Sequence, residues 1–144
     1  MASIQRHAIV PYSPEQMFRL VDNVEQYPQF LPWCASSAEL SRENGAVTGC
    51  VELAKGGIRK SFTTLNTLTP FEKIEMKLVE GPFRHLHGFW WFAPLKNGEA
   101  CKVSLELDYE FSNRIVSLAI GPVFNTVANS LVDAFVERAR NVYG

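Results

Sequence analysis

The chain carries almost no net charge. Its 14 lysine and arginine residues are balanced by 15 aspartate and glutamate residues, for a formal net charge of −1. A nearly neutral protein has no long-range attraction for nucleic acid or for an anionic membrane. A polyanionic partner would therefore need a local cluster of basic side chains.

Cysteine pairs are also lacking. Cys34, Cys50 and Cys101 are an odd number, and none of them stands in a C-x-x-C motif. This pattern argues against a disulfide framework and against a structural zinc site. The first residues contain no apolar run of the length found in signal peptides. We therefore expect a cytoplasmic protein in a reducing compartment.

No apolar run is long enough to span a membrane without interruption, because polar residues such as Asn129 and Asp133 break the stretch 115–143 at every turn. Its apolar residues recur at three- and four-residue steps and include Phe124, Val127, Leu131, Val132, Phe135, Val136 and Val142. This spacing predicts one amphipathic helix. We expect it to begin at Pro122, a favoured first helical residue, and to end before Gly144.

The N-terminal segment predicts a strand followed by two short helices. A strand over 3–10 precedes Ser13, which is placed to cap a helix with Pro14 in its first turn. Gln16 is placed to close a capping box with the serine. A second helical turn is predicted over 24–30.

Alternation of apolar and polar residues predicts strands through the rest of the chain. They are expected at 36–43, 46–55, 58–68, 73–80, 86–94 and 101–112. The dipeptides Asn44-Gly45 and Asn97-Gly98 supply the turn chemistry of hairpins. At 144 residues and 47% hydrophobic, the chain has the size of one domain, residues 1–144. We predict an α+β fold in which a seven-stranded antiparallel sheet curls around the long final helix.

Five motifs resemble those of a known family. They are Val10-Pro11-Tyr12-Ser13 with Met17-Phe18, Tyr27-Pro28-x-Phe30-Leu31-Pro32-Trp33-Cys34, Leu78-Val79-x-Gly81-Pro82-Phe83, Gly88-x-Trp90-x-Phe92 and Phe135-x-x-Arg138-Ala139-x-x-Val142-Tyr143. With the order of elements, they resemble the START-like helix-grip superfamily of lipid-transfer proteins and polyketide cyclases. Within it, the whole chain is similar to the coenzyme Q-binding protein family, which has bacterial ribosome-association toxins among its members.

The resemblance implies a cavity between the sheet and the final helix that takes ubiquinone or another prenyl lipid, in support of respiratory quinone function. For the bacterial members it implies instead binding to the large (50S) ribosomal subunit, which blocks 70S formation and translation initiation. The residues favour the cavity, because Gly49, Thr64 and Gly88 are small inward residues that leave space opposite the helix. Such pockets are typically on the order of 300–1,000 Å³. In the alternative interpretation the aromatic side chains fill this space themselves.

The predicted cavity lining combines inward strand residues, apolar residues of the final helix and the aromatic segment 30–33. It consists of Phe30, Leu31, Trp33, Phe62, Met76, Leu78, Phe83, Leu86, Trp90, Phe92, Val103, Leu105, Phe124, Val127, Leu131 and Phe135. The segment 30–33 is predicted to form a gate at the cavity mouth. The alternative is a loop folded back onto the core.

The strand over 86–94 also predicts an outward row. Phe89 and Trp91 are expected to point away from the core and form a patch for a homodimer, a partner protein or transient membrane contact. Cover by a neighbouring loop is the alternative. His85 and His87 share this face, but the sequence shows no third ligand, so we predict no metal site.

The sequence contains one cluster of basic side chains and no recognisable set of catalytic residues. Lys55, Arg59 and Lys60 flank the Gly56-Gly57 turn and are the predicted contacts to ribosomal phosphates, unless they serve solubility alone. No Ser-His-Asp set, paired inward acids or phosphate-binding glycine loop is recognisable. We therefore predict a protein that is not an enzyme and has no catalytic cofactor, although polyketide cyclases and aromatases use the same fold.

Overall fold

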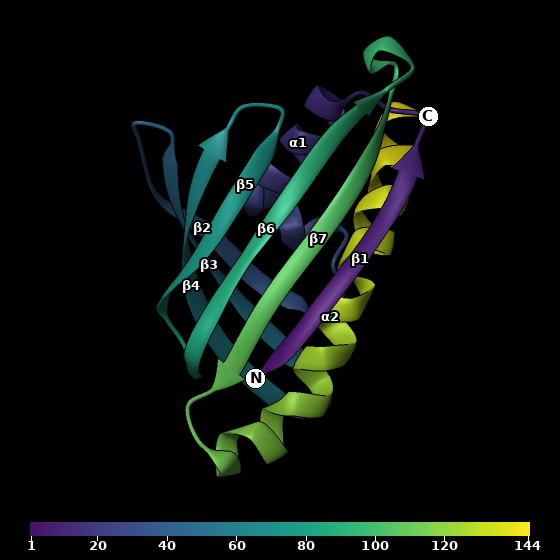
Figure 1. The fold of residues 1–144 in the computed structure, drawn as a ribbon. Coiled ribbons are helices and arrows are strands. Elements are labelled where there is room, and N and C mark those ends of the chain that lie inside the picture. Colours follow the sequence, from purple (N-terminus) through teal and green to yellow (C-terminus); the bar gives the residue numbers. More distant parts are fainter.

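The computed structural model describes all residues from 1 to 144 and has the predicted order of elements (Figure 1). The strands are β1 (Ala2–Val10), β2 (Cys34–Glu43), β3 (Ala46–Lys55), β4 (Ile58–Thr69), β5 (Lys73–Glu80), β6 (Phe83–Leu95) and β7 (Ala100–Phe111). The helices are α1 (Pro14–Asp22), α2 (Arg114–Tyr143) and the 3-10 helices η1 (Val24–Gln29) and η2 (Lys96–Gly98). The predicted α+β architecture is confirmed.

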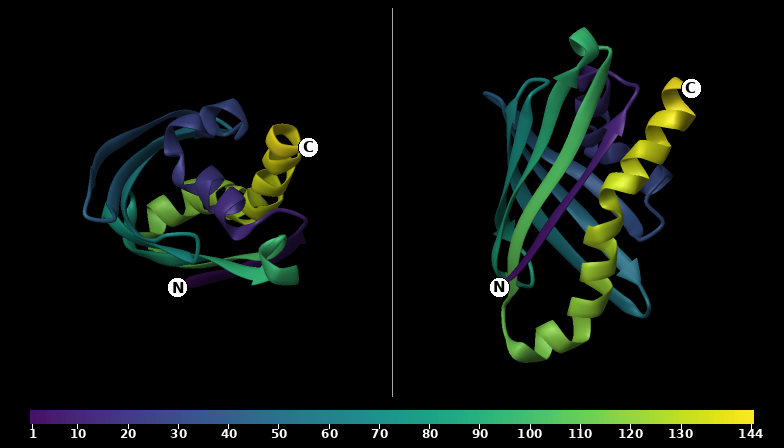
Figure 2. Two further views of the ribbon diagram at one scale, coloured as in Figure 1. Left: turned by 90° about the horizontal axis from the view of Figure 1, so that it is seen from above. Right: turned by 45° about the vertical axis from the view of Figure 1, so that its right-hand side comes forward.

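All seven strands form one sheet in the order β1-β7-β6-β5-β4-β3-β2, with every neighbouring pair antiparallel. The first strand pairs with the last, so that Ile4 lies opposite Leu107. The sheet curves around the helices, as the view from above shows (Figure 2). Asn44 and Gly45 have φ values of 51° and 77°, which a tight two-residue hairpin requires.

Helix α1 begins with the predicted capping box. The Gln16 N–H donates to Ser13 Oγ at 3.1 Å, and the Ser13 N–H donates to Gln16 Oε1 at 2.8 Å. Two amide groups that the helix itself leaves free are thereby satisfied. The Tyr143 hydroxyl donates to the Gln16 carbonyl at 2.9 Å, which ties the end of α2 to α1.

Helix α2 begins two turns before the predicted start. Its first residue is Arg114, and Asn113 caps it by accepting the Val116 N–H at 2.9 Å. The prediction that the helix begins at Pro122 was wrong, because this proline lies exposed inside the helix. Proline there removes one backbone hydrogen bond and favours a bend. Figure 2 shows the first turns of α2 at an angle to the rest.

By length and composition, α2 is apolar enough to cross a membrane. In the fold it serves as the central core helix, with Phe124, Val127 and Phe135 buried against the sheet. At about 1.5 Å per residue, its 30 residues extend for about 45 Å. The helix thus runs along the inner face of the curved sheet (Figure 2).

Candidate functional site

An apolar pocket lies between the inner face of the sheet and α2. Its volume is about 100 Å³, and 15 of its 18 lining residues are hydrophobic. The lining comes from η1, the following loop, β3 to β7 and α2, and comprises Val24, Tyr27, Trp33, Gly49, Val51, Phe62, Thr64, Asn66, Met76, Leu86, Trp90, Leu105, Leu107, Phe124, Val127, Ala128, Leu131 and Phe135.

The pocket is smaller than the 300–1,000 Å³ expected from typical ligand sites. Aromatic side chains occupy much of the interior, since Tyr27 and Trp90 both pack edge-on against Phe135 with ring centroids 5.5 and 5.3 Å away. The alternative interpretation, in which aromatic side chains fill the space themselves, therefore describes most of this interior. An apolar cavity that holds a benzene molecule has a volume of about 150 Å³, which is larger than the space here, so the pocket encloses at most about one prenyl unit or part of a ring.

Most of the residues predicted to line a cavity surround this pocket: Trp33, Phe62, Met76, Leu86, Trp90, Leu105, Phe124, Val127, Leu131 and Phe135. Those that lie outside it are Phe30, Leu31, Leu78, Phe83, Phe92 and Val103. Phe92 faces the inner side of the sheet but packs on Phe18 of α1, with ring centroids 5.6 Å apart. Because α1 covers that end of the sheet, the inward residues there belong to the closed core.

The segment 30–33 does not form an open gate. Leu31 and Trp33 are 1% and 7% exposed, and the Ala54 N–H donates to the Trp33 carbonyl at 2.8 Å, which ties the segment to β3. The alternative interpretation, a loop folded back onto the core, therefore describes these two residues. Trp33 forms part of the pocket wall, and Phe30 and Pro32 reach the surface.

The small inward residues differ in what they do. Gly49 and Thr64 line the pocket. Gly88 does not, because atoms of β7 occupy the position that its side chain would take. The prediction that Gly88 leaves room for a ligand was wrong.

Two polar side chains line the pocket, Thr64 and Asn66 of β4. The Thr64 hydroxyl donates to Asn66 Oδ1 at 2.9 Å. The Tyr27 hydroxyl donates to the Val21 carbonyl, and burial raises the pKa of Tyr27 above its ordinary value. No lining residue is a carboxylic acid, a histidine or a cysteine. The wall therefore offers hydrogen bonds to a ligand but no group that readily exchanges a proton near neutral pH.

Sequence reasoning missed part of the lining: Val24, Tyr27, Val51, Asn66, Leu107 and Ala128. For Asn66 a signal was present, because the spacing of two from Thr64 and of four from Phe62 places all three on one strand face. For Tyr27 the signal was weaker, since its place depends on how η1 docks on the sheet.

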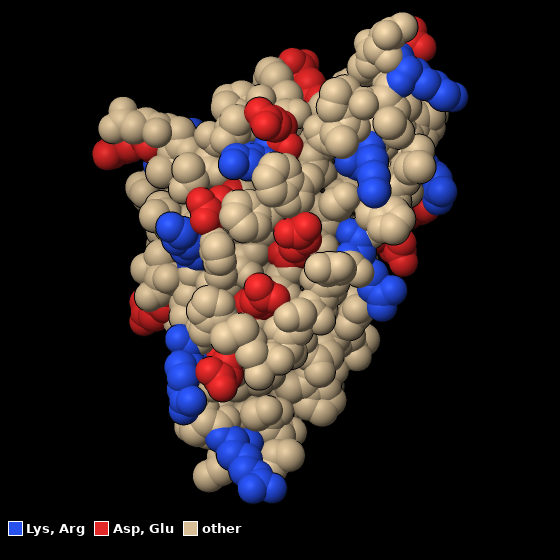
Figure 3. Space-filling model, viewed as in Figure 1, with Lys and Arg blue, Asp and Glu red and all other residues tan.

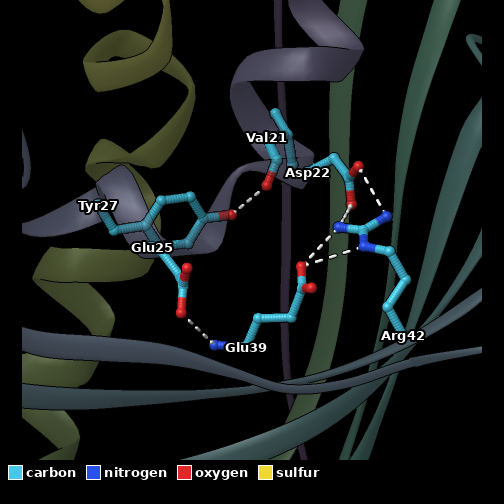
Figure 4. A network of polar contacts seen from close by, with 6 residues as sticks. All are labelled: Val21, Asp22, Glu25, Tyr27, Glu39 and Arg42. Atoms are coloured by element: carbon cyan, nitrogen blue, oxygen red, sulfur yellow. Dashed lines mark hydrogen bonds and ion pairs between the residues drawn. The ribbon is translucent and has the colours of Figure 1, made fainter.

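An ionic network holds η1 and α1 against the edge of the sheet (Figure 4). Arg42 of β2 donates to the Asp22 carboxylate at 3.1 and 3.2 Å and to Glu39 Oε1 at 2.6 Å. The Glu39 N–H in turn donates to Glu25 at 3.3 Å. The Arg42 guanidinium holds the pKa of the Glu39 carboxyl below its ordinary value. Because Tyr27 of η1 lines the pocket, this network positions one pocket wall.

The outer face of β6 carries the predicted aromatic row. The Phe89 and Trp91 rings stack with centroids 5.4 Å apart, and the Lys73 ammonium lies 5.3 Å from the Trp91 ring. Both rings are half-buried by their neighbours on the sheet.

On the same face, His87 Nε2 lies 2.7 Å from Glu75 Oε2, a carboxylate partner that the sequence did not reveal, and this contact lowers the pKa of Glu75. No three potential metal ligands are grouped anywhere in the chain. Contact of the row with a dimer mate or a membrane stays a prediction.

The basic cluster at the turn between β3 and β4 is partly neutralised. Arg59 pairs with Glu52 at 3.0 Å, and Lys55 and Lys60 are exposed. On the face seen in Figure 3, basic and acidic side chains are interspersed, with basic ones at the lower tip. Within this cluster, Lys55 and Lys60 are therefore the charges that no acidic side chain neutralises.

A curved antiparallel sheet that grips a long helix, with an apolar pocket between them, defines a helix-grip domain. The chain belongs to the family described as polyketide cyclase/dehydrase and lipid transport, which matches residues 10–136. It is 49% identical over 143 residues to ribosome association toxin RatA of Escherichia coli K12, covering 99% of this chain and 90% of that protein. The predicted family membership is confirmed.

Two further proteins resemble this chain, one in sequence and one in fold. The chain is 27% identical over 139 residues to the mitochondrial coenzyme Q-binding protein COQ10 homolog B of Xenopus laevis, covering 94% of this chain and 57% of that protein. The solved structure of the Zhui aromatase/cyclase from Streptomyces sp. R1128 superposes with a TM-score of 0.87 at 14% identity, covering 99% of this chain and 96% of that one. This second likeness shows the fold alone.

Proposed function

We propose that the protein binds a prenyl lipid, with ubiquinone as the leading ligand, and does not transform it chemically. The observation that carries the proposal is the apolar pocket under α2, in which 15 of 18 lining residues are hydrophobic. The name of the COQ10 relative supports a quinone. The lack of acidic, histidine and cysteine side chains in the wall supports binding without catalysis.

The pocket volume limits how much of a ligand is enclosed. Burial of apolar carbon contributes roughly 0.8 kcal/mol per carbon, so one five-carbon prenyl unit would contribute about 4 kcal/mol before ordering costs. That free energy corresponds to a Kd of about 1 mM. Micromolar affinity therefore requires that a ring or a second prenyl unit also lose its contact with water.

Extraction and titration test the proposal. Organic extracts of the protein purified from bacterial cells should contain a prenyl quinone by mass spectrometry, near one per chain. Titrations with quinones that carry zero, one, two or ten prenyl units should show affinity rising over the first one or two units and then levelling off. Equal affinity for the tail-less and the ten-unit quinone would contradict the proposal.

A second candidate function is association with the ribosome. Relatives 46–49% identical over nearly the whole chain are named ribosome association toxin. Contact with phosphates of the large subunit would fall to Lys55 and Lys60, because Glu52 already neutralises Arg59. Such an association would place the protein in the cytoplasm, as the sequence predicts.

Co-sedimentation separates this candidate from the first. The double variant Lys55→Glu, Lys60→Glu should release the protein from large ribosomal subunits at moderate salt. The matched control is Lys102→Glu on β7, away from the turn, which should leave sedimentation unchanged. Unchanged sedimentation of the double variant would remove the turn as the contact.

A further inference from the structure

The pocket contains one polar spot, formed by Thr64 and Asn66 on the inner face of β4. The spot lies among hydrophobic residues of β3, β5 and α2. A polar group in an apolar wall is unfavourable unless a hydrogen bond satisfies it. The pair therefore either stabilises the fold through its own bond or meets a polar group of the ligand.

The bond between the two residues uses only part of their capacity. The Thr64 hydroxyl donates its hydrogen to Asn66 Oδ1 at 2.9 Å. A carboxamide also carries two N–H donors, and no protein group accepts a hydrogen bond from Asn66 Nδ2. Every fully buried side-chain nitrogen or oxygen in the structure has a hydrogen-bond partner. Because Asn66 Nδ2 has none, it is not fully buried. It is therefore open to a ligand, and Thr64 fixes which side of the amide faces outward.

Gly49 keeps the space beside this donor free. It lies opposite Thr64 in the ladder between β3 and β4. A Cβ atom at Gly49 would lie 3.9 Å from Asn66 Nδ2 and 3.5 Å from a Val24 methyl group. A larger side chain would stand between the amide and the pocket. The open space and the unused donor thus occur at the same place.

We propose that Asn66 selects the head group of the ligand by donating a hydrogen bond to a carbonyl oxygen of a quinone ring. A quinone carbonyl accepts but does not donate, which matches the side of the carboxamide that Thr64 leaves free. The carbonyl edge of the ring lies beside Asn66 in the pocket, and the rest of the ligand extends toward the surface. This inference rests on the proposed prenyl-lipid function and deepens it.

Two probes with the same tail test the inference. One is ubiquinone with two prenyl units, and the other is geranylbenzene, which has the same ten-carbon tail and no acceptor oxygen. Binding to the full chain is followed by quenching of the fluorescence of Trp33 and Trp90, which line the pocket. Asn66→Leu should weaken the quinone about tenfold and change geranylbenzene less than twofold.

Two companion variants separate the donor from packing. Asn66→Asp keeps the shape of the side chain but replaces the N–H donors with a carboxylate oxygen, and should weaken the quinone at least as much. Thr67→Val, on the exposed face of the same strand, is the matched control and should affect neither probe. Thermal unfolding without ligand shows which variants are folded.

The outcomes distinguish the role of Asn66 from the prenyl-lipid function on which it rests. Unchanged quinone affinity in Asn66→Asp, or an equal loss for both probes, would overturn the role of Asn66 and leave the prenyl-lipid function standing. Failure of the wild-type protein to bind either probe would overturn both.

Discussion

A Cβ atom on Gly88 would lie 2.5 Å from the carbonyl oxygen of Glu106 on the neighbouring strand. It would also lie 2.8 Å from a methyl carbon of Leu107. Backbone on a central strand cannot move aside without disturbing its own ladder. Glycine at this position is therefore required by the close approach of β6 and β7 and not by a ligand.

Gly88→Ala should accordingly destabilise the protein. Overpacking of this kind costs about 1–3 kcal/mol, which denaturant unfolding measures as a lower midpoint at an unchanged slope. Affinity of the folded fraction for quinone should stay the same, because this residue does not line the pocket. A variant as stable as the wild type would show that the two strands tolerate separation.

Gly49→Ala should instead keep the stability of the protein and weaken its quinone binding. Its Cβ would be 3.5 Å from the nearest atom, which is ordinary contact, so the side chain fits. Stability should be unchanged or rise by about 0.4–1 kcal/mol, because alanine restricts the unfolded chain. The added methyl group narrows the pocket, so calorimetry should show several-fold weaker quinone binding. Wild-type affinity would mean that the ligand does not use this side of the pocket.

The C-terminal motif holds η1 in place through Arg138. Its guanidinium lies 4.9 Å from the Phe30 ring and donates to Gln29 Oε1 at 3.0 Å. Arg138→Met keeps the aliphatic packing and removes both contacts, at an expected cost of about 1 kcal/mol.

Hydrogen exchange measures this effect locally. Amides of residues 27–31 should exchange faster in Arg138→Met, while those of β7 keep their protection. The control is Arg140→Met, which breaks only the exposed ion pair with Glu137 and should change little. Faster exchange throughout the protein would indicate global destabilisation instead of release of η1.

The order of elements could be predicted because its signals are local. The capping box of Ser13 and Gln16 and the turn at Asn44-Gly45 depend on residues adjacent in sequence, and both are present. The start of α2 was missed although a local signal, the capping residue Asn113, was present. Pro122 has the chemistry of a first helical residue, and the preceding turns are helical because Asn113 caps them.

The candidate site was harder to predict than the fold. Alternation identifies the inward face of each strand, and Leu105 and Trp90 were assigned to it on this basis. Alternation does not show where another element covers that face. The positions of α1 over Phe92 and of η1 beside Trp33 depend on contacts between distant segments, so the closed core and the pocket could not be separated.

Acid should weaken the attachment of η1 and α1 through Glu39. Arg42 lowers the pKa of the Glu39 carboxyl below its ordinary value of 4.5. A carboxyl whose pKa is lower in the folded state stabilises the fold above the unfolded pKa. That contribution is lost as the pH falls through the lower folded pKa. The urea midpoint of unfolding should therefore decline between about pH 5 and about pH 3, a range that brackets the ordinary carboxyl pKa.

The matched variant for this prediction is Arg42→Met. Without the guanidinium, Glu39 loses the cause of its lowered pKa, so the variant should be less stable at neutral pH and depend less on pH in the acid range. Arg19→Met, which removes the exposed pair with Glu15, serves as the control. Parallel pH profiles of wild type and Arg42→Met would contradict the role of Glu39.

Trp33→Ala tests whether the pocket wall also belongs to the core. Trp33 is 7% exposed and lines the pocket, so its truncation should cost about 3–5 kcal/mol and merge a new cavity with the existing one. The wider space should accept a ring more readily, so a short-tailed ubiquinone should raise the Tm of the variant more than that of the wild type. Trp33→Phe keeps most of the side-chain volume, so its ligand-induced rise in Tm should lie between those of the wild type and Trp33→Ala. A Tm of Trp33→Ala near that of the wild type would instead indicate that the segment 30–33 opens as a gate, because its tryptophan would then contribute little to the packed core.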